Sequence, residues 1–377
     1  MSELYTLPDG WEWKNLEYVC GKDSSNISLK TIENDNGIYP IYGAKGLIKT
    51  ISSYRREESY ISIIKDGAGV GRVMICQEKS SIIGTMQYLI PKNNVSLKFL
   101  FYFLSTIDFN KYINGATIPH IYYKDYKNNP FPLPPIEEQK RIVDKLDILF
   151  AKIDKAIALH QKNIDEANVF MVSVLNDIFV ELEEKYEKIP LFDVADVNRG
   201  KSKHRPRNDK KLFGGNYPFI QTGDVRNANK YINTFNETYS EFGLSQSKLW
   251  KKCTICMTIA ANIGDVAILN IDSCFPDSVV GIYSENNSND YLYYFLLTLK
   301  QQLESQATTT AQMNINLKVL QTIGVPLPPV KNQQKVVSYL DEISQKVEKI
   351  KQIQKEKMQS LKELKVSILD QAFRGEL

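Results

Sequence analysis

An internal repeat is the feature that most constrains what this chain can fold into. Residues 130–139 read PFPLPPIEEQ and residues 324–333 read GVPLPPVKNQ, an offset of 194 residues between the matching prolines. The offset holds without a gap further along, and the paired residues are alike: Ile142 and Val336, Leu146 and Leu340, Asp147 and Asp341, Ile153 and Val347, Val174 and Ile368, Phe179 and Phe373. Self-similarity at one long, fixed period predicts two copies of a single structural unit.

Weaker similarity extends the repeat toward the start of each copy. The matched segments are 39–43 with 217–221, the aromatic-rich runs 97–112 with 290–305, and 115–121 with 309–315. The chain should therefore alternate between globular and helical regions. The expected regions are 1–130 (globular), 131–187 (helical), 188–323 (globular) and 324–377 (helical).

Both globular regions contain short apolar runs that are separated by Gly, Asn and Asp. These runs are 60–64, 73–76 and 81–83 in the first region, and 254–259 and 266–269 in the second. Apolar runs of this length between turn residues are typical of β-strands. The fold class we expect is α/β, with a mixed α/β domain that occurs twice.

Each helical region predicts one long helix. Pro134 and Pro135 suit a helix that begins directly after them. Apolar or near-apolar positions then recur in steps of four and three, as in a coiled-coil heptad. These positions are 146, 150, 153, 157, 160, 164, 167, 171, 174 and 178 in the first helix, and 340, 343, 347, 350, 358, 361, 364 and 368 in the second. A helix of about 44 residues would be about 65 Å long.

The charges of the two helical regions favour pairing between them. Residues 131–187 contain 12 acidic and 7 basic residues, whereas residues 324–377 contain 7 acidic and 10 basic residues. Opposite net charges favour association of the two helices, although single surface pairs contribute little. We expect an antiparallel coiled coil with pseudo-twofold symmetry, which would hold the globular domains at opposite ends.

Two polar residues interrupt the apolar seam near the middle of each helix. His160 occupies a seam position in the first helix, and Gln354 lies at the repeat offset in the second. One interpretation is a polar layer that fixes the register of the coiled coil. The other is that both side chains simply extend to solvent.

Composition limits the class of protein and its compartment. No segment approaches the roughly 18 consecutive apolar residues of a membrane span, and the first residues, MSELYTLPDGWEW, do not resemble a signal peptide. Five cysteines in 377 residues do not form a disulfide framework. These features predict a cytoplasmic protein that has no contact with a membrane.

Four segments resemble the specificity subunit of type I restriction–modification systems, and the resemblance covers essentially the whole chain. They are LPDGWEWKNLEYV at 7–19, PLPPIEEQKRIVDKLD at 132–147, PLPPVKNQQKVVSYLDEI at 326–343 and SILDQAFRGEL at 367–377. The resemblance implies that regions 1–130 and 188–323 are target-recognition domains, each reading one half of a split double-stranded DNA sequence. It implies that the helices act as a ruler between the halves.

The resemblance also implies partners and cofactors. Two methylation subunits would dock on the helices and would carry S-adenosylmethionine. Restriction and motor subunits would use ATP and Mg²⁺. The chain itself would hold no cofactor and no catalytic site. The alternative, from another class, is a coiled-coil scaffold whose globular ends bind proteins.

DNA contact is expected at local basic clusters, because neither globular region is broadly basic. The densest cluster lies within residues 199–211, with basic side chains suited to phosphates and guanine edges. Its members are Arg199, Lys201, Lys203, His204, Arg205, Arg207, Lys210 and Lys211. Polar residues beside the repeated segments are candidates for base contacts: Gln221, Thr222, Asp224 and Arg226 in the second region, and Tyr42 and Lys45 in the first. Weaker basic candidates in the first region are Lys49, Arg55, Arg56, Lys65 and Arg72.

Several motifs resemble catalytic or ligand sites but lack essential residues. Asp66–Arg72 is rich in glycine but has no G-K-[ST], so a tight turn explains it better than a nucleotide site. Cys253 and Cys256 have zinc-like spacing without a second pair of ligands, which favours two buried thiols and no metal site. Asn129-Pro130-Phe131 lacks the second proline of adenine methyltransferases. The shared segments 117–123 and 308–316 either touch DNA or tie each domain to its helix.

Overall fold

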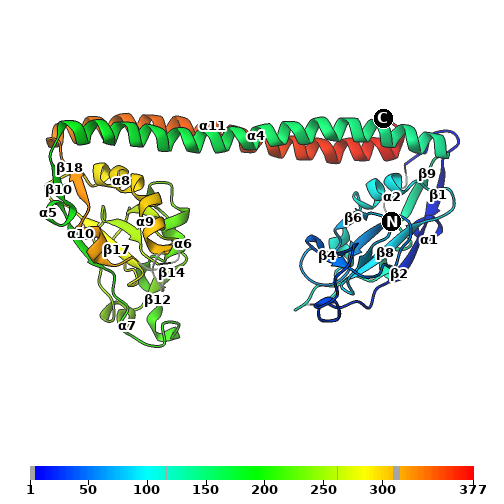
Figure 1. Cartoon of the computed structure of the whole chain (residues 1–377), viewed down its shortest axis with the longest axis horizontal. Helices are drawn as coiled ribbons and strands as arrows, with labels where there is room; N and C mark the ends of the chain where they lie inside the picture. Colours follow the sequence, from blue (N-terminus) through cyan, green and yellow to red (C-terminus); the bar gives the residue numbers. More distant parts are fainter. Residues whose placement is uncertain (1–4, 116, 261, 309–314) are drawn as a thin grey trace. The chain divides into compact units, whose positions relative to one another are not determined.

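The computed structural model describes residues 5–115, 117–260, 262–308 and 315–377. They form two compact units, one made of Met1–Gln161 with Lys355–Leu377 and the other of Lys162–Gln354. Each unit contains one globular domain and a stretch of both long helices (Figure 1). The chain therefore has the duplicated organisation that the repeat predicts.

The first domain combines two small β-sheets with helix α2. A four-stranded antiparallel sheet has the order β2-β8-β5-β6, and a three-stranded sheet has the order β4-β3-β7. The elements are β1 Glu12–Asn15, α1 Leu16–Val19, β2 Cys20–Ser24, η1 Lys30–Ile32, β3 Tyr39–Gly43, β4 Gly46–Ile51, β5 Tyr60–Ile64, β6 Val73–Cys76, β7 Ser81–Ile82, β8 Met86–Pro91, α2 Leu97–Leu104, η2 Phe109–Tyr112, α3 Tyr123–Tyr126 and β9 Pro130–Leu133. β5 is buried along its whole length and forms the centre of this domain.

The second domain also combines a main β-sheet, a smaller β-ribbon and short helices, and its main sheet is larger. Five strands take the order β11-β17-β15-β16-β13, and β12 pairs with β14 in a separate ribbon. The elements are β10 Lys188–Pro190, α5 Leu191–Val194, β11 Asp196–Arg199, η3 Lys210–Leu212, β12 Phe213–Phe219, α6 Thr222–Asn227, β13 Tyr231–Ile232, β14 Glu237–Tyr239, α7 Glu241–Ser245, β15 Ile255–Thr258, β16 Val266–Leu269, β17 Val279–Tyr283, α8 Asn289–Thr298, α9 Lys300–Thr308, α10 Leu317–Gln321 and β18 Gly324–Pro326. The predicted mixed α/β class is confirmed for both domains.

The two long helices are α4 (Ile136–Lys185) and α11 (Val330–Arg374). Both begin one residue after a Pro-Pro pair, as the sequence predicts, because proline fits before a helix but not inside it. A short antiparallel ribbon precedes each helix, β1 with β9 before α4 and β10 with β18 before α11. The repeated prolines therefore lie in a joint that occurs once in each copy.

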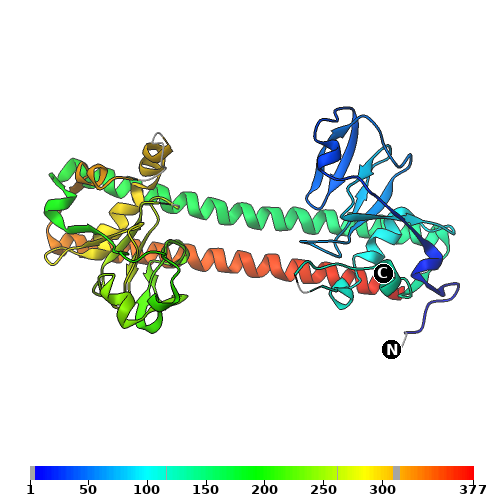
Figure 2. The same ribbon diagram turned by 90° about the horizontal axis from the view of Figure 1, so that it is seen from below.

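Within each unit, α4 and α11 lie side by side and run antiparallel (Figures 1 and 2). In the first unit Lys365 Nζ is 2.5 Å from Asp154 Oδ1, and nearer the start of α4 Arg141 donates to the Leu377 carbonyl (2.8 Å). In the second unit Asn163 donates to Gln354 (3.3 Å). A step forward along α4 is thus matched by a step backward along α11, which confirms the predicted direction of pairing.

The seam between the helices differs in part from the predicted positions. Ile350 and Leu364, both predicted to lie in it, are each 46% exposed. Lys365, which follows Leu364, is instead half-buried with its ammonium over the ring of Phe150 (4.8 Å). A long side chain can bury its aliphatic stem while its charge reaches a partner, so the periodicity of apolar residues alone misplaced the seam here.

Aromatic residues of each domain pack against the long helices. In the first unit Phe373 of α11 lies 5.1 Å from Phe99 of α2. In the second unit Phe179 of α4, its repeat counterpart, lies 5.5 Å from Phe295 of α8. The aromatic runs therefore belong to the core between each domain and the long helices, and in the first domain the helical part of the run ends at Leu104.

A buried glutamine anchors each domain to the first turns of a long helix. Gln139 and Gln333, at the repeat offset, are 1% and 0% exposed. Each accepts a hydrogen bond at 2.9 Å from the N-cap backbone of an aromatic helix, Ser96 for α2 and Ser288 for α8. Each also donates to the carbonyl of the proline five residues earlier. The glutamine in the repeated motif therefore links each domain to its long helix through buried hydrogen bonds, a role that the sequence did not reveal.

Candidate nucleic-acid interface

The basic loop, residues 199–211, connects β11 to β12 in the second domain. Its central arginines are engaged within the protein. Arg205 Nη1 donates to two carbonyls of the same loop, at 2.6 and 2.9 Å. Arg207 Nη2 lies 2.9 and 2.8 Å from the two carboxylate oxygens of Asp277. These guanidinium groups hold the loop in shape, which the sequence pattern could not show.

The ends of the basic loop are also tied to the domain. Arg199 donates to the Ile315 carbonyl (3.2 Å), and the His204 ring lies 2.8 Å from the Asp209 carboxylate. The Lys211 backbone N–H and the His204 ring hold the pKa of Asp209 below its ordinary value. The loop is therefore a braced structure.

Four lysines of the basic loop have exposed side chains. They are Lys201, Lys203, Lys210 and Lys211. None of them forms an ion pair with another of the residues that the structure describes. Exposed ammonium groups on a braced loop are well suited to neutralising phosphates, since they give up no ion pair on binding.

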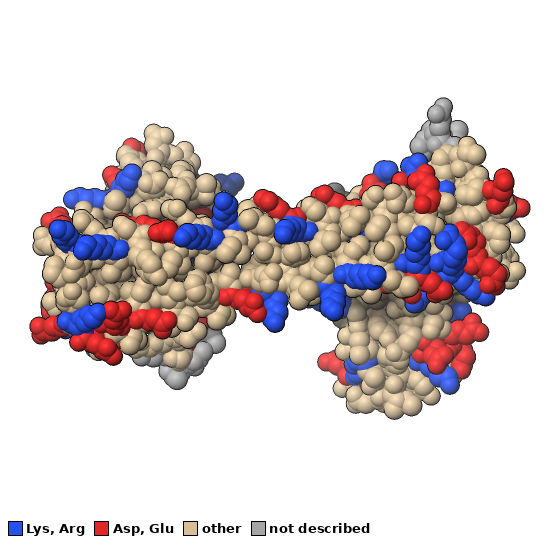
Figure 3. Space-filling view, turned by 90° about the horizontal axis from the view of Figure 1, so that it is seen from above, with Lys and Arg blue, Asp and Glu red and all other residues tan. Residues whose placement is uncertain are grey.

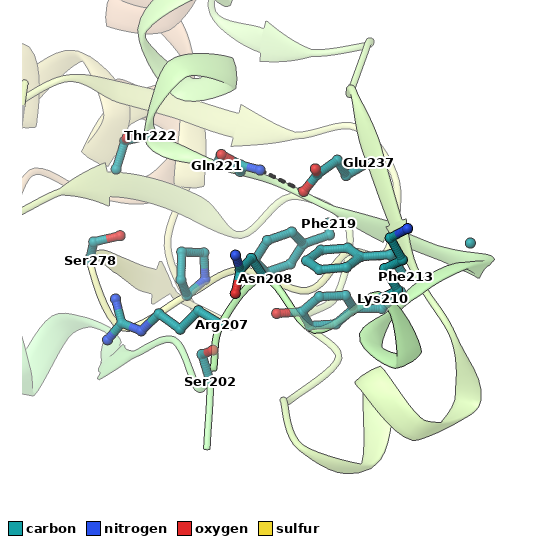
Figure 4. Close-up of a pocket in the computed structure, with 13 residues that line it drawn as sticks. Ser202, Arg207, Asn208, Lys210, Phe213, Phe219, Gln221, Thr222, Glu237 and Ser278 are labelled. Atoms are coloured by element: carbon teal, nitrogen blue, oxygen red, sulfur yellow. Dashed lines mark hydrogen bonds between the residues drawn. The ribbon is translucent and has the colours of Figure 1, made fainter. Parts of the chain in front are cut away.

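A cavity of about 670 Å³ lies between the basic loop and the β12–β14 ribbon (Figure 4). Aromatic rings form one side of it, where Phe219 and Tyr239 stack at 4.0 Å with an interplanar angle of 14°. The lining residues are Ser202, Arg207, Asn208, Lys210, Phe213, Gly214, Phe219, Gln221, Thr222, Glu237, Tyr239, Pro276 and Ser278. Six of these are predicted DNA-binding residues or lie directly beside one. The aromatic wall was missed because Phe213 and Phe219 lie on β12 whereas Tyr239 comes from β14.

The predicted polar cluster at the start of α6 is divided between structure and surface. Asp224 accepts a hydrogen bond from the Gln221 backbone (2.8 Å), so it caps α6. Arg226 donates to Asn262 (2.7 Å). Gln221 and Thr222 face the cavity (Figure 4). Of the four candidates, these two are therefore the ones that line the cavity.

In the first domain, three candidates lie on the β3–β4 hairpin. Tyr42 is half-buried in β3, and burial raises the pKa of its hydroxyl. Lys45 is exposed in the turn of the hairpin. Lys49 donates to the backbone carbonyls of Ile32 and Glu33 (3.0 and 3.2 Å). The hairpin brings these residues into one element, with Lys45 the most exposed of them.

The remaining candidates of the first domain are dispersed. Arg55 is exposed and donates to Asn26 (3.0 Å). Arg56 is half-buried, and its Nε has no hydrogen-bond partner among the described residues. Lys65 lies 3.7 Å from Asp66, and Arg72 is exposed at the other end of the same glycine-rich turn. These residues therefore form two separate pairs, Arg55 with Arg56 and Lys65 with Arg72, and not one continuous basic surface.

The glycine-rich turn and the shared anchor segment meet in both domains. The Ile121 N–H donates to the Lys65 carbonyl (2.9 Å), and at the repeat offset the Ile315 N–H donates to the Ile259 carbonyl (3.0 Å). Gly67, Gly69 and Gly71 have φ of 88°, 86° and 86°, as a tight turn requires. The anchors therefore tie the sheet to the segment before each joint. Residues 309–314 of the second anchor lie outside the described residues.

The motifs that resembled chemistry have structural roles. Cys256 is buried, and burial raises its pKa, but Cys253 is exposed, so the expectation of two buried thiols is wrong for Cys253. Asn129 accepts a hydrogen bond from the Tyr112 hydroxyl (2.9 Å), a contact that joins the two sides of the first anchor segment. No group of three or more potential metal ligands occurs among the described residues.

The proposed polar layer involves one residue from each unit. Gln354 is half-buried and accepts the hydrogen bond from Asn163 of α4. His160 is half-buried on α4 in the first unit. A cross-helix contact from Gln354 supports a role in register, which stays a prediction for the pair.

Comparison with known proteins gives a consistent result over the whole chain. A family model for the type I restriction modification DNA specificity domain matches twice, at residues 8–168 and 183–357. A putative type I restriction enzyme specificity subunit from Haemophilus influenzae is 25% identical over 358 residues, which cover 88% of this chain and 86% of the relative. The putative MjaX specificity subunit from Methanocaldococcus jannaschii is 25% identical over 423 residues, covering 98% and 94%.

The fold is also found among solved structures. A chain from a type I restriction–modification system superposes with a TM-score of 0.75 and 22% identity, covering 99% of this chain and 100% of that one. Among the described helices, none is apolar enough over sufficient length to cross a membrane. The two matches of the family model coincide with the two copies of the internal repeat.

Proposed function

Because this chain belongs to the family of type I restriction modification DNA specificity domains, we propose that it selects a split double-stranded DNA target for a larger complex. Its two domains are target recognition domains, and each would read one half of the target. The observation that carries this proposal is the pair of unlike domains built on one repeated helical joint. Two different reading surfaces predict a non-palindromic target, in contrast to the symmetric sites of homodimers.

The chemistry would belong to partner subunits. Methylation subunits would bind S-adenosylmethionine and modify adenine, and restriction and motor subunits would use ATP and Mg²⁺. This chain would supply position and sequence selectivity, with the long helices setting the distance between half-sites.

Exposed apolar residues on the long helices support docking of two copies of the same partner. Four exposed residues of the first unit have exposed apolar counterparts in the second unit at the repeat offset. The pairs are Ile136 with Val330, Leu159 with Ile353, Leu364 with Phe170, and Val366 with Val172. Charged residues are scattered among uncharged ones on the helix face (Figure 3). Exposed apolar residues that recur in this way mark an interaction surface present once in each unit.

The basic loop is the feature best suited to DNA backbone contact in the second domain. Its four exposed lysines and its neighbouring cavity lie on the same loop, so phosphate and base contacts would be made together. Phosphate contacts position a protein on DNA, whereas contacts to base edges give selectivity.

Salt dependence of binding tests this role without knowledge of the target. We expect the Lys201→Ala, Lys203→Ala double variant to bind a random-sequence duplex with a slope of log K against log salt that is lower by roughly 2, about 0.9 per phosphate contact. Lys331→Ala, Lys335→Ala on α11 is the matched control, because both lysines are exposed in the same unit. Equal slopes for all three proteins would remove the loop from the interface.

Mapping of methylated adenines tests the function as a whole. A host that expresses this chain with its methylation subunits should carry methylation at one split, asymmetric sequence. If no adenine methylation depended on the chain, while partner proteins still bound its helices, a protein scaffold would be the better interpretation.

A further inference from the structure

We propose that the cavity between the basic loop and the β12–β14 ribbon receives one nucleobase that has been turned out of the duplex. This inference rests on the proposed function, since it assigns a further site within the second target recognition domain. The ligand would be adenine or cytosine, read at its exocyclic amino group, with its backbone phosphate at the mouth of the cavity.

The shape of the cavity fits a planar ring. Its volume of about 670 Å³ lies in the range of roughly 300–1,000 Å³ that is usual for small-molecule sites. Phe219 and Tyr239 form a stacked pair, and the ring of Phe213 lies 5.3 Å from Tyr239 at 60°. Phe219 and Tyr239 are buried, so the half-buried Phe213 ring is the one that would stack on an extruded base, which can be of any sequence because every base has a π-face.

The polar lining would distinguish among bases. Gln221 Nε2 donates to Glu237 Oε2 (2.7 Å), which fixes the amide and holds the carboxylate at the cavity. Figure 4 shows this pair on one side of the cavity, with Asn208 beside the aromatic rings. Carboxylate and amide oxygens accept from an amino group, as in contacts to cytosine and adenine. The lining therefore favours these two bases over thymine.

Cations lie where the backbone of such a base would enter. Arg207 and Lys210 both line the cavity and belong to the basic loop. Arg207 is held by Asp277, whereas the Lys210 side chain is exposed. A phosphate at the mouth would meet Lys210 directly. The chemistry of aromatic wall, oxygen acceptors and cation is that of a nucleotide site.

Among the described residues of the first domain, aliphatic side chains fill the equivalent space. Its matching segment places Ile41 at the position of Phe219 and Gly43 at that of Gln221, and both segments pair in parallel with a neighbouring chain segment. A Cβ on Gly43 would lie 2.8 Å from Ile48 Cδ1 and 3.3 Å from Ile83 Cδ1. Aliphatic side chains occupy that place, so the site is specific to the second domain.

Weakened base pairs test the proposal. Extrusion costs least where a base is already mispaired. The protein assembled with its methylation subunits would be titrated with duplexes of the mapped target, each carrying one mismatch in the half read by the second domain. At one adenine or cytosine, replacing the complementary base should tighten binding by roughly tenfold or more.

Glu237→Ala should abolish that gain at the same position, because the base loses its acceptor. Glu241→Ala is the matched control. Both glutamates are exposed and accept one side-chain hydrogen bond, but only Glu237 lines the cavity. A position at which both variants keep the gain reports extrusion by the methylation subunits and does not support this site.

Three outcomes separate the ideas. If the complex that contains the unsubstituted chain did not bind the duplex at all, the proposed function and this inference would both be overturned. Tight duplex binding with no mismatch gain sensitive to Glu237→Ala would overturn the inference alone. Free dAMP or dCMP that binds the cavity without competing with the duplex would show a site for free nucleotides, which also overturns it.

Discussion

Replacing Gln333, the buried glutamine of the second joint, should show how much its hydrogen bonds stabilise the second unit. Gln333 is fully buried, and its amide makes three hydrogen bonds. It accepts from the Ser288 backbone (2.9 Å) and donates to the Pro328 carbonyl (2.9 Å) and to Asn287 Oδ1 (3.0 Å). Gln333→Ala leaves all three groups without this partner.

The size of the effect follows from those contacts. An unsatisfied buried polar group costs about 1–3 kcal/mol, and the Pro328 carbonyl is the most deeply buried of the three. Partial access of water to Ser288 and Asn287 reduces their share. We therefore expect the free energy of unfolding of the second unit to fall by about 2–4 kcal/mol.

Denaturant unfolding followed by tryptophan fluorescence measures this change. Trp250 is the tryptophan of the second unit, is 5% exposed and stacks on Phe275 at 4.7 Å. A background with Trp11→Phe and Trp13→Phe makes it the sole reporter. Amide hydrogen exchange locates the effect, which should be strongest in α8, since Ser288 caps that helix.

Controls make the test specific. Gln334→Ala changes the exposed neighbour and should alter stability by less than about 0.5 kcal/mol. Gln139→Ala should destabilise α2 in the first unit and leave α8 unchanged. If Gln333→Ala lowered the free energy of unfolding no more than Gln334→Ala does, or if amide exchange rose equally in α2 and α8, the proposal that Gln333 links α8 to α11 would be refuted.

Three further predictions concern pH, docking and spacing. Burial raises the pKa of Asp147, but hydrogen bonds from Lys98 and Tyr102 outweigh it and hold that pKa below its ordinary value. The stability from this carboxylate is therefore complete above about pH 5 and is lost as the pH falls further. Asp147→Asn should flatten the loss of first-unit stability between about pH 5 and 3 in denaturant titrations. Phe170→Asp and Leu364→Asp should each remove one methylation subunit from the complex in native mass spectrometry. Val180→Asp should remove none, because Val180 is exposed but its counterpart at the repeat offset is the charged Arg374. Deleting one heptad from each long helix should shorten the tolerated gap between half-sites by about 10 Å, or roughly three base pairs, and an unchanged gap in methylation mapping would exclude the helices as the ruler.

The sequence by itself determined the elements whose signals are local. The predicted runs 60–64, 73–76 and 266–269 coincide with β5, β6 and β16, and α4 begins directly after Pro135. Strand runs, turn glycines and helix-starting prolines act through neighbouring residues. For the same reason, the repeat revealed two copies of one architecture before any contact was known.

The tertiary structure decided which of the predicted site residues line the cavity and which make contacts within the protein. Arg205 and Arg207 appeared as free cations in the sequence, but they brace their own loop through partners that include Asp277, seventy residues away. The cavity joins residues from Ser202 to Ser278 across four separate segments. No periodic pattern marks such a meeting, because contacts between distant segments depend on how strands pair and not on the residues beside them.

The same reason explains the helix seam. Heptad spacing correctly predicted long, paired helices, but it placed Ile350 and Leu364 inside and gave no role to Lys365. Which face of a helix is buried is fixed by the partner helix and by the domain packed on it. The period of the pattern belongs to the sequence, and its rotation about the helix axis belongs to the fold.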